Sequence, residues 1–174
     1  MRRLDSVPSV VNLTPRLIVI RSAEPTDVPI IAALIRELAA YEHLEHEVVL
    51  DEAMLQEYLF GARPYAEVLI AVADDVPVGF ALFFHNFSTF LGRPGIYLED
   101  LFVRSDARGR GLGKALLVEL SRRARARGCG RIEWAVLDWN EPSIAFYQSL
   151  GGAPKDDWVL YRITGDAMDA LADA

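Results

Sequence analysis

The sequence predicts a mixed α/β domain whose central sheet is mostly antiparallel. Short apolar runs alternate with segments whose apolar residues recur every three or four positions, so strands and helices follow one another along the chain. A compact turn joins two of the strands, which makes them antiparallel neighbours. A glycine-rich turn lies between a later strand and a long helix, and the strand after that helix is expected to run parallel to its predecessor.

The chain is expected to enter this fold through one strand and one helix. The run from Arg16 to Arg21 has no polar face between its two arginines, which predicts a strand covered on both faces. Thr26 and Asp27 then offer side-chain oxygens for a helix N-cap, and the apolar residues of 30–38 fall at helical spacing.

A second helix and a hairpin follow. Residues 50–60 predict a short helix with Asp51 as its cap. Strands are predicted over residues 67–73 and 78–85, and the connection Asp-Asp-Val-Pro at 74–77 is short enough for a hairpin. These two strands are therefore expected to pair antiparallel.

The second half of the chain contains the glycine-rich turn. The sequence predicts strands over residues 95–103, 131–137 and 158–163, and helices over residues 111–127, 141–150 and 166–174. We find no internal repeat, low-complexity tract or linker. The length of 174 residues then predicts one domain over residues 16–174, preceded by a loosely ordered N-terminal extension at residues 1–15.

Composition and charge narrow the class of partner. The formal net charge of -7 argues against broad nucleic-acid binding, because that affinity depends on clustered Lys and Arg, whereas a cationic substrate is compatible with it. No apolar run approaches the roughly 18 residues that a membrane span needs. The single cysteine, Cys129, cannot form an internal disulfide. We therefore expect a cytoplasmic protein that binds neither nucleic acid nor membranes.

The most specific local signal is the run Arg-Gly-Arg-Gly-Leu-Gly at residues 108–113, between a strand and a helix. Glycines let a ligand approach the backbone closely, and the amides that open a helix are unpaired at the positive end of its dipole. This arrangement predicts an anion site. The run lacks the spacing of the dinucleotide fingerprint and the Gly-Lys-Ser/Thr of the phosphate loop. A tight helix-start turn without a ligand is the alternative interpretation.

The run resembles the Arg/Gln-x-x-Gly-x-Gly/Ala pyrophosphate loop of the GNAT superfamily of N-acetyltransferases, in the same strand-loop-helix context. The resemblance implies acetyl-CoA as cosubstrate, with the loop amides at its pyrophosphate and the preceding strand along its pantetheine arm. A solvated basic face is the alternative for the cations of this segment. The cofactor-binding residues implied in this part of the chain are Leu101, Phe102, Val103, Arg108, Gly109, Arg110, Gly111, Leu112, Gly113 and Lys114.

A second motif follows in the order that the GNAT superfamily has. Residues 139–147, Trp-Asn-Glu-Pro-Ser-Ile-Ala-Phe-Tyr, match its Asn followed by a helix that bears Tyr. Asn140 suits a helix N-cap and Pro142 suits the first turn. The resemblance implies that Asn140, Ser143 and Tyr147 contact the cofactor and that Tyr147 is the general acid that protonates the departing CoA thiolate. A core aromatic is the alternative role for Tyr147.

Three segments resemble, more narrowly, the diamine (spermidine/spermine) acetyltransferase branch and its thialysine-acetylating relatives. They are Leu-Ala-Ala-Tyr-Glu at 38–42, Tyr-Leu-Glu-Asp-Leu-Phe-Val at 97–103 and Trp-Asn-Glu-Pro-Ser at 139–143, within a resemblance that runs from Leu17 to Met168. The resemblance implies that Glu99 takes a proton, through water, from the substrate ammonium. A carboxylate suits this role when desolvation raises its pKa. A strand-end ion pair is the alternative for Glu99 and Asp100.

The same branch implies how the amine is held. Tyr41 and Glu42 match substrate-binding positions, where an aromatic face and a carboxylate hold a cation. The loop before Trp158 is shorter than in the polyamine enzymes, which leaves the length of the substrate open. The substrate-binding residues implied are Tyr41, Glu42, Glu99, Asp100 and Asp156.

Two other chemistries are disfavoured by the sequence. His43 and His46 lie among glutamates, but no second cluster completes a coordination shell, so no metal is expected. Cys129 as a covalent acyl carrier is a rival mechanism, yet its Gly-Cys-Gly setting has no motif His near it.

Together with these patterns, the resemblance implies a GNAT fold, with helices on both faces of the sheet, and an N-acetyltransferase. Acetyl transfer is expected to proceed directly from acetyl-CoA to a primary amine of a small polyamine-like or diamine-like cation. Thialysine or another small amine or amino acid is the alternative acceptor. A non-catalytic acyl-CoA-binding sensor is the alternative of a different class. The resemblance also implies a homodimer.

Overall fold

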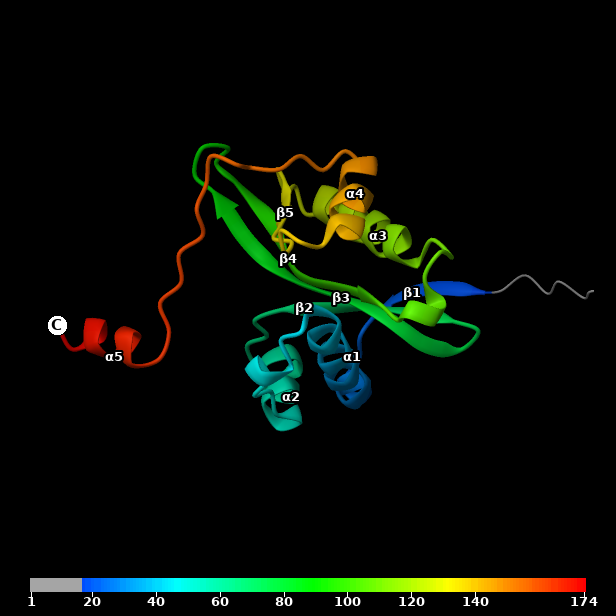
Figure 1. Cartoon of the computed structure of the whole chain (residues 1–174), viewed down its shortest axis with the longest axis horizontal. Coiled ribbons are helices and arrows are strands. Elements are labelled where there is room, and N and C mark those ends of the chain that lie inside the picture. Colours follow the sequence, from blue (N-terminus) through cyan, green and yellow to red (C-terminus); the bar gives the residue numbers. More distant parts are fainter. Residues whose placement is uncertain (1–16) are drawn as a thin grey trace, which may run out of the picture. The chain divides into compact units, whose positions relative to one another are not determined.

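The computed structural model describes residues 17–174 (Figure 1). The chain divides into two compact units, one that ends at Ala135 and one that spans residues 136–174. The predicted N-terminal extension at residues 1–15 lies outside the described residues. The single domain over residues 16–174 stays a prediction.

The first unit is built on a five-stranded sheet in the order β1-β2-β3-β4-β5. The strands are β1 (Ile18–Ser22), β2 (Glu67–Ala73), β3 (Val76–Ser88), β4 (Arg93–Val103) and β5 (Ile132–Trp134). Strands β1 to β4 pair antiparallel, and β5 pairs parallel to β4. This confirms the predicted sheet, which is mostly antiparallel and becomes parallel on one side of β4. Strand β5 is shorter than the predicted 131–137.

Strand β1 lies at an edge of the sheet, which corrects the expectation that both of its faces are covered. Its residues Ile18 and Val19 are 37% and 39% exposed. An edge strand has a neighbour on one side only, so helices that pack over the middle of the sheet cover it incompletely. The apolar run predicted the strand correctly and its burial incorrectly.

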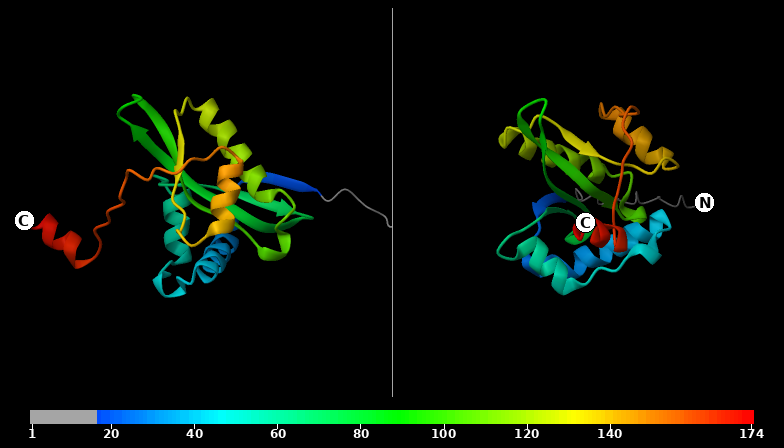
Figure 2. Two further views of the ribbon diagram at one scale, coloured as in Figure 1. Left: turned by 45° about the horizontal axis from the view of Figure 1, so that its top comes forward. Right: turned by 90° about the vertical axis from the view of Figure 1, so that its left-hand side faces the viewer.

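Helices cover both faces of the sheet, as predicted (Figures 1 and 2). Helices α1 (Val28–Glu42) and α2 (Glu52–Phe60) pack on one face, and α3 (Leu112–Ala126) packs on the other. The core of the first face includes Ile31, Leu34, Leu38, Leu59, Ile70, Phe80 and Phe102, and that of the second includes Leu69, Phe83, Ile96, Leu98, Leu112, Leu116 and Leu120. Because side chains alternate along a strand, neighbours such as Leu69 and Ile70 belong to opposite cores.

Two of the three predicted helix caps are present. Asp51 accepts from the amides of Ala53 and Met54, and Asn140 accepts from the amide of Ser143. The predicted cap at Asp27 is wrong.

The Asp27 carboxylate is diverted from capping by a charged partner. It accepts two bonds from Arg21, at 2.6 and 2.8 Å, and one from the amide of Glu24 at 2.7 Å. These bonds lower the pKa of Asp27, the Arg21 contribution being the largest. A short 3-10 turn, Pro25–Asp27, precedes α1, and the Asp27 side chain caps the start of this turn at the Glu24 amide instead of capping α1. A bidentate bond from a charged guanidinium is stronger than a bond from a neutral amide, so the Asp27 carboxylate pairs with Arg21 instead of capping α1.

The hairpin between β2 and β3 has the turn that its sequence favours. Asp74 and Asp75 form the two-residue turn, with φ of 52° and 65°. Positive φ at both positions is the requirement of a type I′ turn, and Asp tolerates this region better than most residues. The antiparallel pairing predicted from this connection is confirmed.

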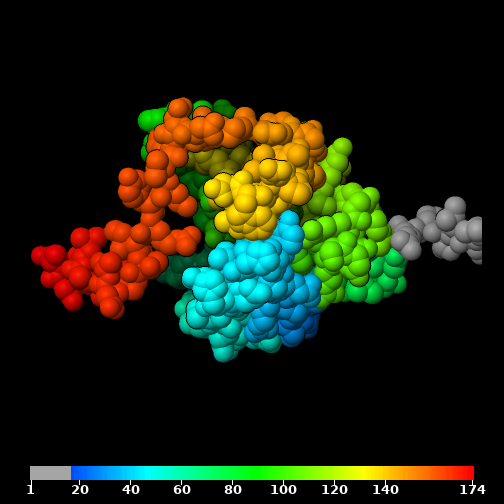
Figure 3. Space-filling view, viewed as in Figure 1, coloured from blue at the N-terminus to red at the C-terminus, as the bar shows by residue number. Residues whose placement is uncertain are grey.

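The second unit contains α4 (Glu141–Ser149) and α5 (Asp166–Ala172), joined by an extended segment. The strand predicted over residues 158–163 is absent, which corrects the expectation from its apolar sequence. Of its backbone amides, only that of Trp158 is bonded to another described backbone group, the carbonyl of Lys155. Its side chains are exposed, for example Trp158 at 72% and Tyr161 at 89%. Figure 3 shows the atoms of this orange segment at the surface. A strand needs a second strand for its hydrogen bonds, and this unit supplies none.

Replacement of Leu116 by Ala tests the core between α3 and the sheet. Leu116 is fully buried, so Leu116→Ala should lower the free energy of unfolding by about 2–5 kcal/mol. Urea unfolding followed by circular dichroism measures this change. Val118→Ala, on the exposed side of the same helix, is the control and should cost under about 1 kcal/mol. Equal losses in the two variants would contradict the packing of α3.

Candidate active site

The loop that connects β4 to α3 is open where the sequence predicts an anion. Gly109 and Gly111 have φ of 74° and 80°, a region that favours glycine. A Cβ atom at either position would meet no atom within 4 Å. The glycines are therefore required by the path of the backbone and not by crowding, and space remains beside the loop for a ligand.

The first amides of α3 follow this loop directly. The amide of Ala115 donates to the Gly111 carbonyl at 2.9 Å, and this is the first hydrogen bond of the helix. The helix itself therefore provides no acceptor for the amides of residues 112–114. Leu112 is 1% exposed, and its side chain anchors the loop in the core. Of the predicted ligand residues, Leu112 thus offers only its backbone. A 15-residue helix that begins in an open glycine loop suits a phosphate group.

Strand β4 has an open edge just before the loop. Its pairing with β5 covers only residues 96–98. The Arg104 amide donates to Val78 of β3, so alternation turns the backbone groups of Leu101 and Val103 toward the other edge. Phe102, which alternates with them, turns its backbone toward β3 and is 6% exposed. Of the three predicted strand residues, Leu101 and Val103 can offer backbone groups to a pantetheine chain, and Phe102 is a core residue.

Glu99 is the extra residue of a β-bulge. In the pairing with β3, Leu98 lies opposite Phe83 and Asp100 lies opposite Leu82, which leaves Glu99 unmatched. A bulge turns side chains away from strict alternation, and bulges are common beside active sites. Glu99 is exposed and Asp100 is half-buried. The bulge therefore lets two successive carboxylates lie near one another at the open edge of β4.

Glu42 completes an acidic cluster with these two residues. Burial, and after it the charges of Glu99 and Glu42, together raise the pKa of Asp100 to about 7. Burial also raises the pKa of Glu42. Carboxylates that are partly withdrawn from water, and that repel one another, attract a cation and can accept a proton near neutral pH.

Tyr41 and Glu42 are positioned by an ion pair that the sequence analysis did not find. They lie at the end of α1. Arg104, directly after β4, forms a bidentate ion pair with Glu37 of that helix, with N–O distances of 2.6–3.2 Å. The pair links the helix that bears Tyr41 to the strand that bears Glu99. The two partners are 67 residues apart in the sequence, so no local sequence pattern predicts the pair.

Arg108 brings the predicted cofactor loop and the predicted amine site together. Its guanidinium carbon lies 4.5 Å from the centre of the Tyr41 ring and 5.8 Å from that of Phe102, and its Nε donates to the Val103 carbonyl at 2.9 Å. Arg110 instead pairs with Asp74 at 3.1 Å, and Lys114 is exposed. The loop arginines therefore have different partners.

The remaining predicted residues lie in the second unit. Asn140 is 4% exposed and caps α4, with its Oδ1 at 3.3 Å from the Ser143 amide. Tyr147 is half-buried, and its ring centre lies 5.3 Å from that of Phe146. Asp156 is exposed in a turn. The roles of these residues in binding and catalysis stay predictions.

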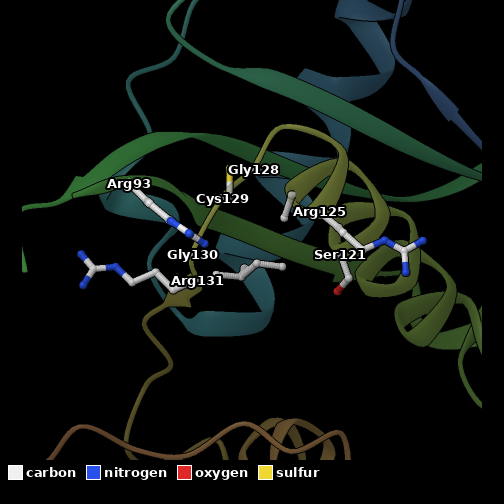
Figure 4. A pocket seen from close by; sticks show the side chains of 9 residues that line it. Arg93, Ser121, Arg125, Gly128, Cys129, Gly130 and Arg131 are labelled. Carbon is white, nitrogen blue, oxygen red and sulfur yellow. The ribbon is translucent and has the colours of Figure 1, made fainter. Parts of the chain in front are cut away.

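Cys129 lies at the opposite end of α3 from the glycine loop. It lines an open hollow of about 390 Å³ with Gly128, Gly130 and neighbouring arginines (Figure 4). Its amide bonds to the Ala124 carbonyl in the last turn of α3, a helix of 15 residues, or about 22 Å. The guanidinium groups of Arg125 and Arg131 extend in opposite directions. This separation argues against Cys129 as a carrier of the acyl group.

Two further features of the described part of the chain bear on other site classes. Within residues 17–174, no group of three or more His, Cys, Asp or Glu side chains is arranged to hold a metal ion. None of the described helices is both long and apolar enough to cross a membrane.

Comparison with known proteins agrees with this geometry. Residues 31–152 match the acetyltransferase (GNAT) family. An L-ornithine N5-acetyltransferase from Arabidopsis thaliana is 34% identical over 197 residues, which cover 87% of this chain and 86% of that protein. A thialysine N-epsilon-acetyltransferase from Bos taurus is 36% identical over 166 residues, which cover 89% and 97%. A solved integron cassette protein from V. cholerae has a TM-score of 0.76 and 27% identity, over 90% of this chain and 98% of that one.

The open strand edge and the glycine loop before α3 agree with the class of protein that the comparisons show, which is an acetyltransferase. The chain belongs to the acetyltransferase (GNAT) family. The predicted fold, family and enzyme class are confirmed, as is the resemblance to the branch that includes thialysine acetyltransferases. GNAT acetyltransferases use acetyl-CoA as cosubstrate, and the open loop, the first amides of α3 and the free edge of β4 fit its phosphates and amide-containing arm.

Replacement of Asp100 by Asn tests its environment through the pH dependence of stability. An unfolded Asp has a pKa near 3.9, and Asp100 titrates at about 7 in the fold. The folded state therefore holds more protons between these values, so the stabilising effect of protonation is full below about pH 4 and is lost as the pH rises through about 7. Asn is neutral throughout. The stability of Asp100→Asn relative to the natural chain should rise by on the order of 2 kcal/mol from pH 5 to pH 8.

Urea unfolding at both pH values measures this difference. Asp106→Asn, at an exposed carboxylate in the turn after β4, is the matched control and should show a much smaller change. A stability difference for Asp100→Asn that is the same at pH 5 and pH 8 would contradict a raised pKa for this carboxyl group.

Proposed function

We propose that this protein transfers the acetyl group of acetyl-CoA directly to a primary amine of a small, polyamine-like or diamine-like cation. The observation that carries this proposal is the cluster of Glu42, Glu99 and Asp100 at the open edge of β4, on the strand that leads into the glycine loop. A site for a cation and a site for an anion are thereby adjacent in one unit, as an amine acceptor and a CoA donor require. The match to acetyltransferases of small amines supports the same assignment.

Acetyl-CoA supplies an activated acetyl group as a thioester. The amides of residues 109–114 are proposed to bind its pyrophosphate, and Arg108 and Lys114 to add positive charge in an acidic protein. The backbone groups of Leu101 and Val103 are proposed to hold the pantetheine amides along β4. Holding donor and acceptor together in one complex is expected to raise the rate, because the entropy cost of bringing them together is met on binding.

The acidic cluster is proposed to bind the substrate as an ammonium and then remove one proton. Only the neutral amine has the lone pair that attacks the thioester carbonyl carbon. Glu99 is proposed to accept the proton through water. Asp100, whose pKa is about 7, is the neighbouring group that can share this proton near neutral pH. As the carbon–sulfur bond breaks, Tyr147 is proposed to give its phenolic proton to the thiolate, and the second proton of the attacking nitrogen returns to the phenolate through water.

A second acceptor class is the side-chain amine of a basic amino acid. The two relatives named above act, by their names, on L-ornithine and thialysine, and each covers most of this chain. The short loop between α4 and residue 158 agrees with a shorter acceptor than a long polyamine. An amino acid and a diamine present the same terminal ammonium to Glu42 and Asp100, so they differ only in what lies at the far end.

A homodimer and a cytoplasmic location are further parts of the proposal. The apolar side chains of residues 158–163 are exposed in the single chain, and association of two copies would remove such surface from water. The single cysteine supports a reducing compartment. Cell fractionation that recovers the protein with membranes or outside the cytoplasm would contradict the location.

Tyr147→Phe and Glu99→Gln test the two proton-transfer roles. Each variant loses one group that moves a proton, so each should lower kcat by about 100-fold or more. The measurement is acetyl-CoA-dependent release of CoA thiol with spermidine, spermine, putrescine, L-ornithine, thialysine and lysine as acceptors. In Glu99→Gln the amine must lose its proton to water, so the residual activity should keep rising with pH toward the pKa of the free amine.

The control is Tyr65→Phe, which removes a phenolic oxygen from an exposed residue before β2 and should keep full activity. Unchanged kcat in Tyr147→Phe would contradict the general-acid role. Binding of acetyl-CoA without turnover of any acceptor would favour the sensor class over an amine acetyltransferase.

Sedimentation equilibrium tests the dimer. The natural chain should have twice the mass of the 19.4 kDa chain. If residues 158–163 form the contact, the double variant Trp158→Asp and Tyr161→Asp should sediment as a monomer, because it places two charges in an apolar interface. A monomer mass for the natural chain at micromolar concentration would contradict the proposal.

A further inference from the structure

Arg108 differs from the other arginines around the site because no carboxylate of the described residues is its partner. Arg21 pairs with Asp27, Arg104 with Glu37, and Arg110 with Asp74. Within residues 17–174, Arg108 makes no ion pair. The charge of this exposed guanidinium is therefore available to a ligand.

The partners of Arg108 are the groups that the two substrates are expected to use. Its Nε bonds to the carbonyl of Val103, on the edge proposed for the pantetheine arm. Its guanidinium carbon lies 4.5 Å from the centre of the Tyr41 ring, the aromatic face proposed for the substrate cation. One side chain therefore occupies part of the donor site and part of the acceptor site at the same time.

A guanidinium and a substrate ammonium compete for the same property of Tyr41. The face of an aromatic ring attracts a cation through its quadrupole, and a second cation at the same face is repelled. Tyr41 is only half-buried, and Arg108 is exposed, so the arginine is free to leave when a stronger partner arrives. A pyrophosphate offers that partner, because charge-assisted bonds to an anion are stronger than a contact with a ring.

We propose that Arg108 covers the cation-binding face of Tyr41 until acetyl-CoA binds, and that the pyrophosphate then draws it away, so that cofactor binding opens the amine site. This inference rests on the proposed function for the ligands of both sites. Departure of Arg108 also frees the Val103 carbonyl for the pantetheine arm. The enzyme would thereby bind its amine well only when the acetyl donor is in place.

Calorimetric titration of both ligands tests the coupling. CoA serves as the cofactor probe, because it carries the pyrophosphate and the pantetheine arm without an acetyl group to transfer. Spermidine and L-ornithine serve as amine probes. In the natural protein, saturating CoA should tighten the binding of at least one amine by about tenfold, and saturating amine should tighten CoA by the same factor, since coupling is reciprocal.

Arg108→Gln should abolish the coupling. Its amine affinity without CoA should match that of the natural protein with CoA, while its CoA affinity falls. Arg110→Gln is the matched control, because it removes a positive charge from the same loop without touching Tyr41. This variant should bind CoA more weakly and keep the tenfold coupling.

A spectroscopic measurement reports the same step without amine. The ring of Tyr41 should shift the Nε–Hε resonance of Arg108 in arginine-labelled protein, and the Arg108→Gln variant assigns that resonance. Addition of CoA alone should move it toward the position of an arginine away from a ring. A resonance that keeps its position at saturating CoA would overturn the proposed release.

The calorimetric outcomes separate the two levels of the argument. If CoA binds but no amine binds in either state, the proposed function fails and this inference fails with it. If both ligands bind and the natural protein shows no coupling, or Arg108→Gln retains it, the inference alone is overturned.

Discussion

The site depends on one constraint, which is that β4 keeps its pairing with β3 but loses its other neighbour after Leu98. Along residues 96–98 the strand is paired on both sides, and beyond them only on one. The bulge at Glu99 falls at this change of pairing. From here the strand presents carboxylates, then the free backbone of Leu101 and Val103, and then the glycine loop. A single strand thus orders the groups that the amine and the thioester need.

The acidic cluster is costly to the fold and useful to the enzyme for the same reason. Glu42, Glu99 and Asp100 repel one another, and burial of Asp100 disfavours its charged form. An arriving cation removes both costs. The ion pair between Arg104 and Glu37, and the core into which α1 packs, hold the helix that supplies Glu42 in place against this repulsion. Stability and affinity are therefore set against each other in this cluster, as is common where pKa values are shifted.

Local signals in the sequence predicted local structure well. The cap at Asp51, the turn at Asp74 and the strand-loop-helix around Gly111 each depend on residues within a few positions, and each is present. The failures depend on distant partners: Asp27 bonds to Arg21, and residues 158–163 lack a strand to pair with. The bulge and the contact of Arg108 with Tyr41 arise only when segments far apart in the chain meet, so no pattern of spacing contains them.

The cations near the loop show how an acidic protein can retain a site for a polyanion. Arg104 and Arg110 form ion pairs with carboxylates. The first pair connects the end of β4 to α1, and the second connects the loop to the β2–β3 turn. If Arg108 were paired in the same way, a pyrophosphate would have to displace a carboxylate of like charge before it could bind. Resting on an aromatic ring and a carbonyl, the guanidinium is partly compensated without being neutralised. The charge stays available to the donor, and the ring that compensates it belongs to the acceptor site.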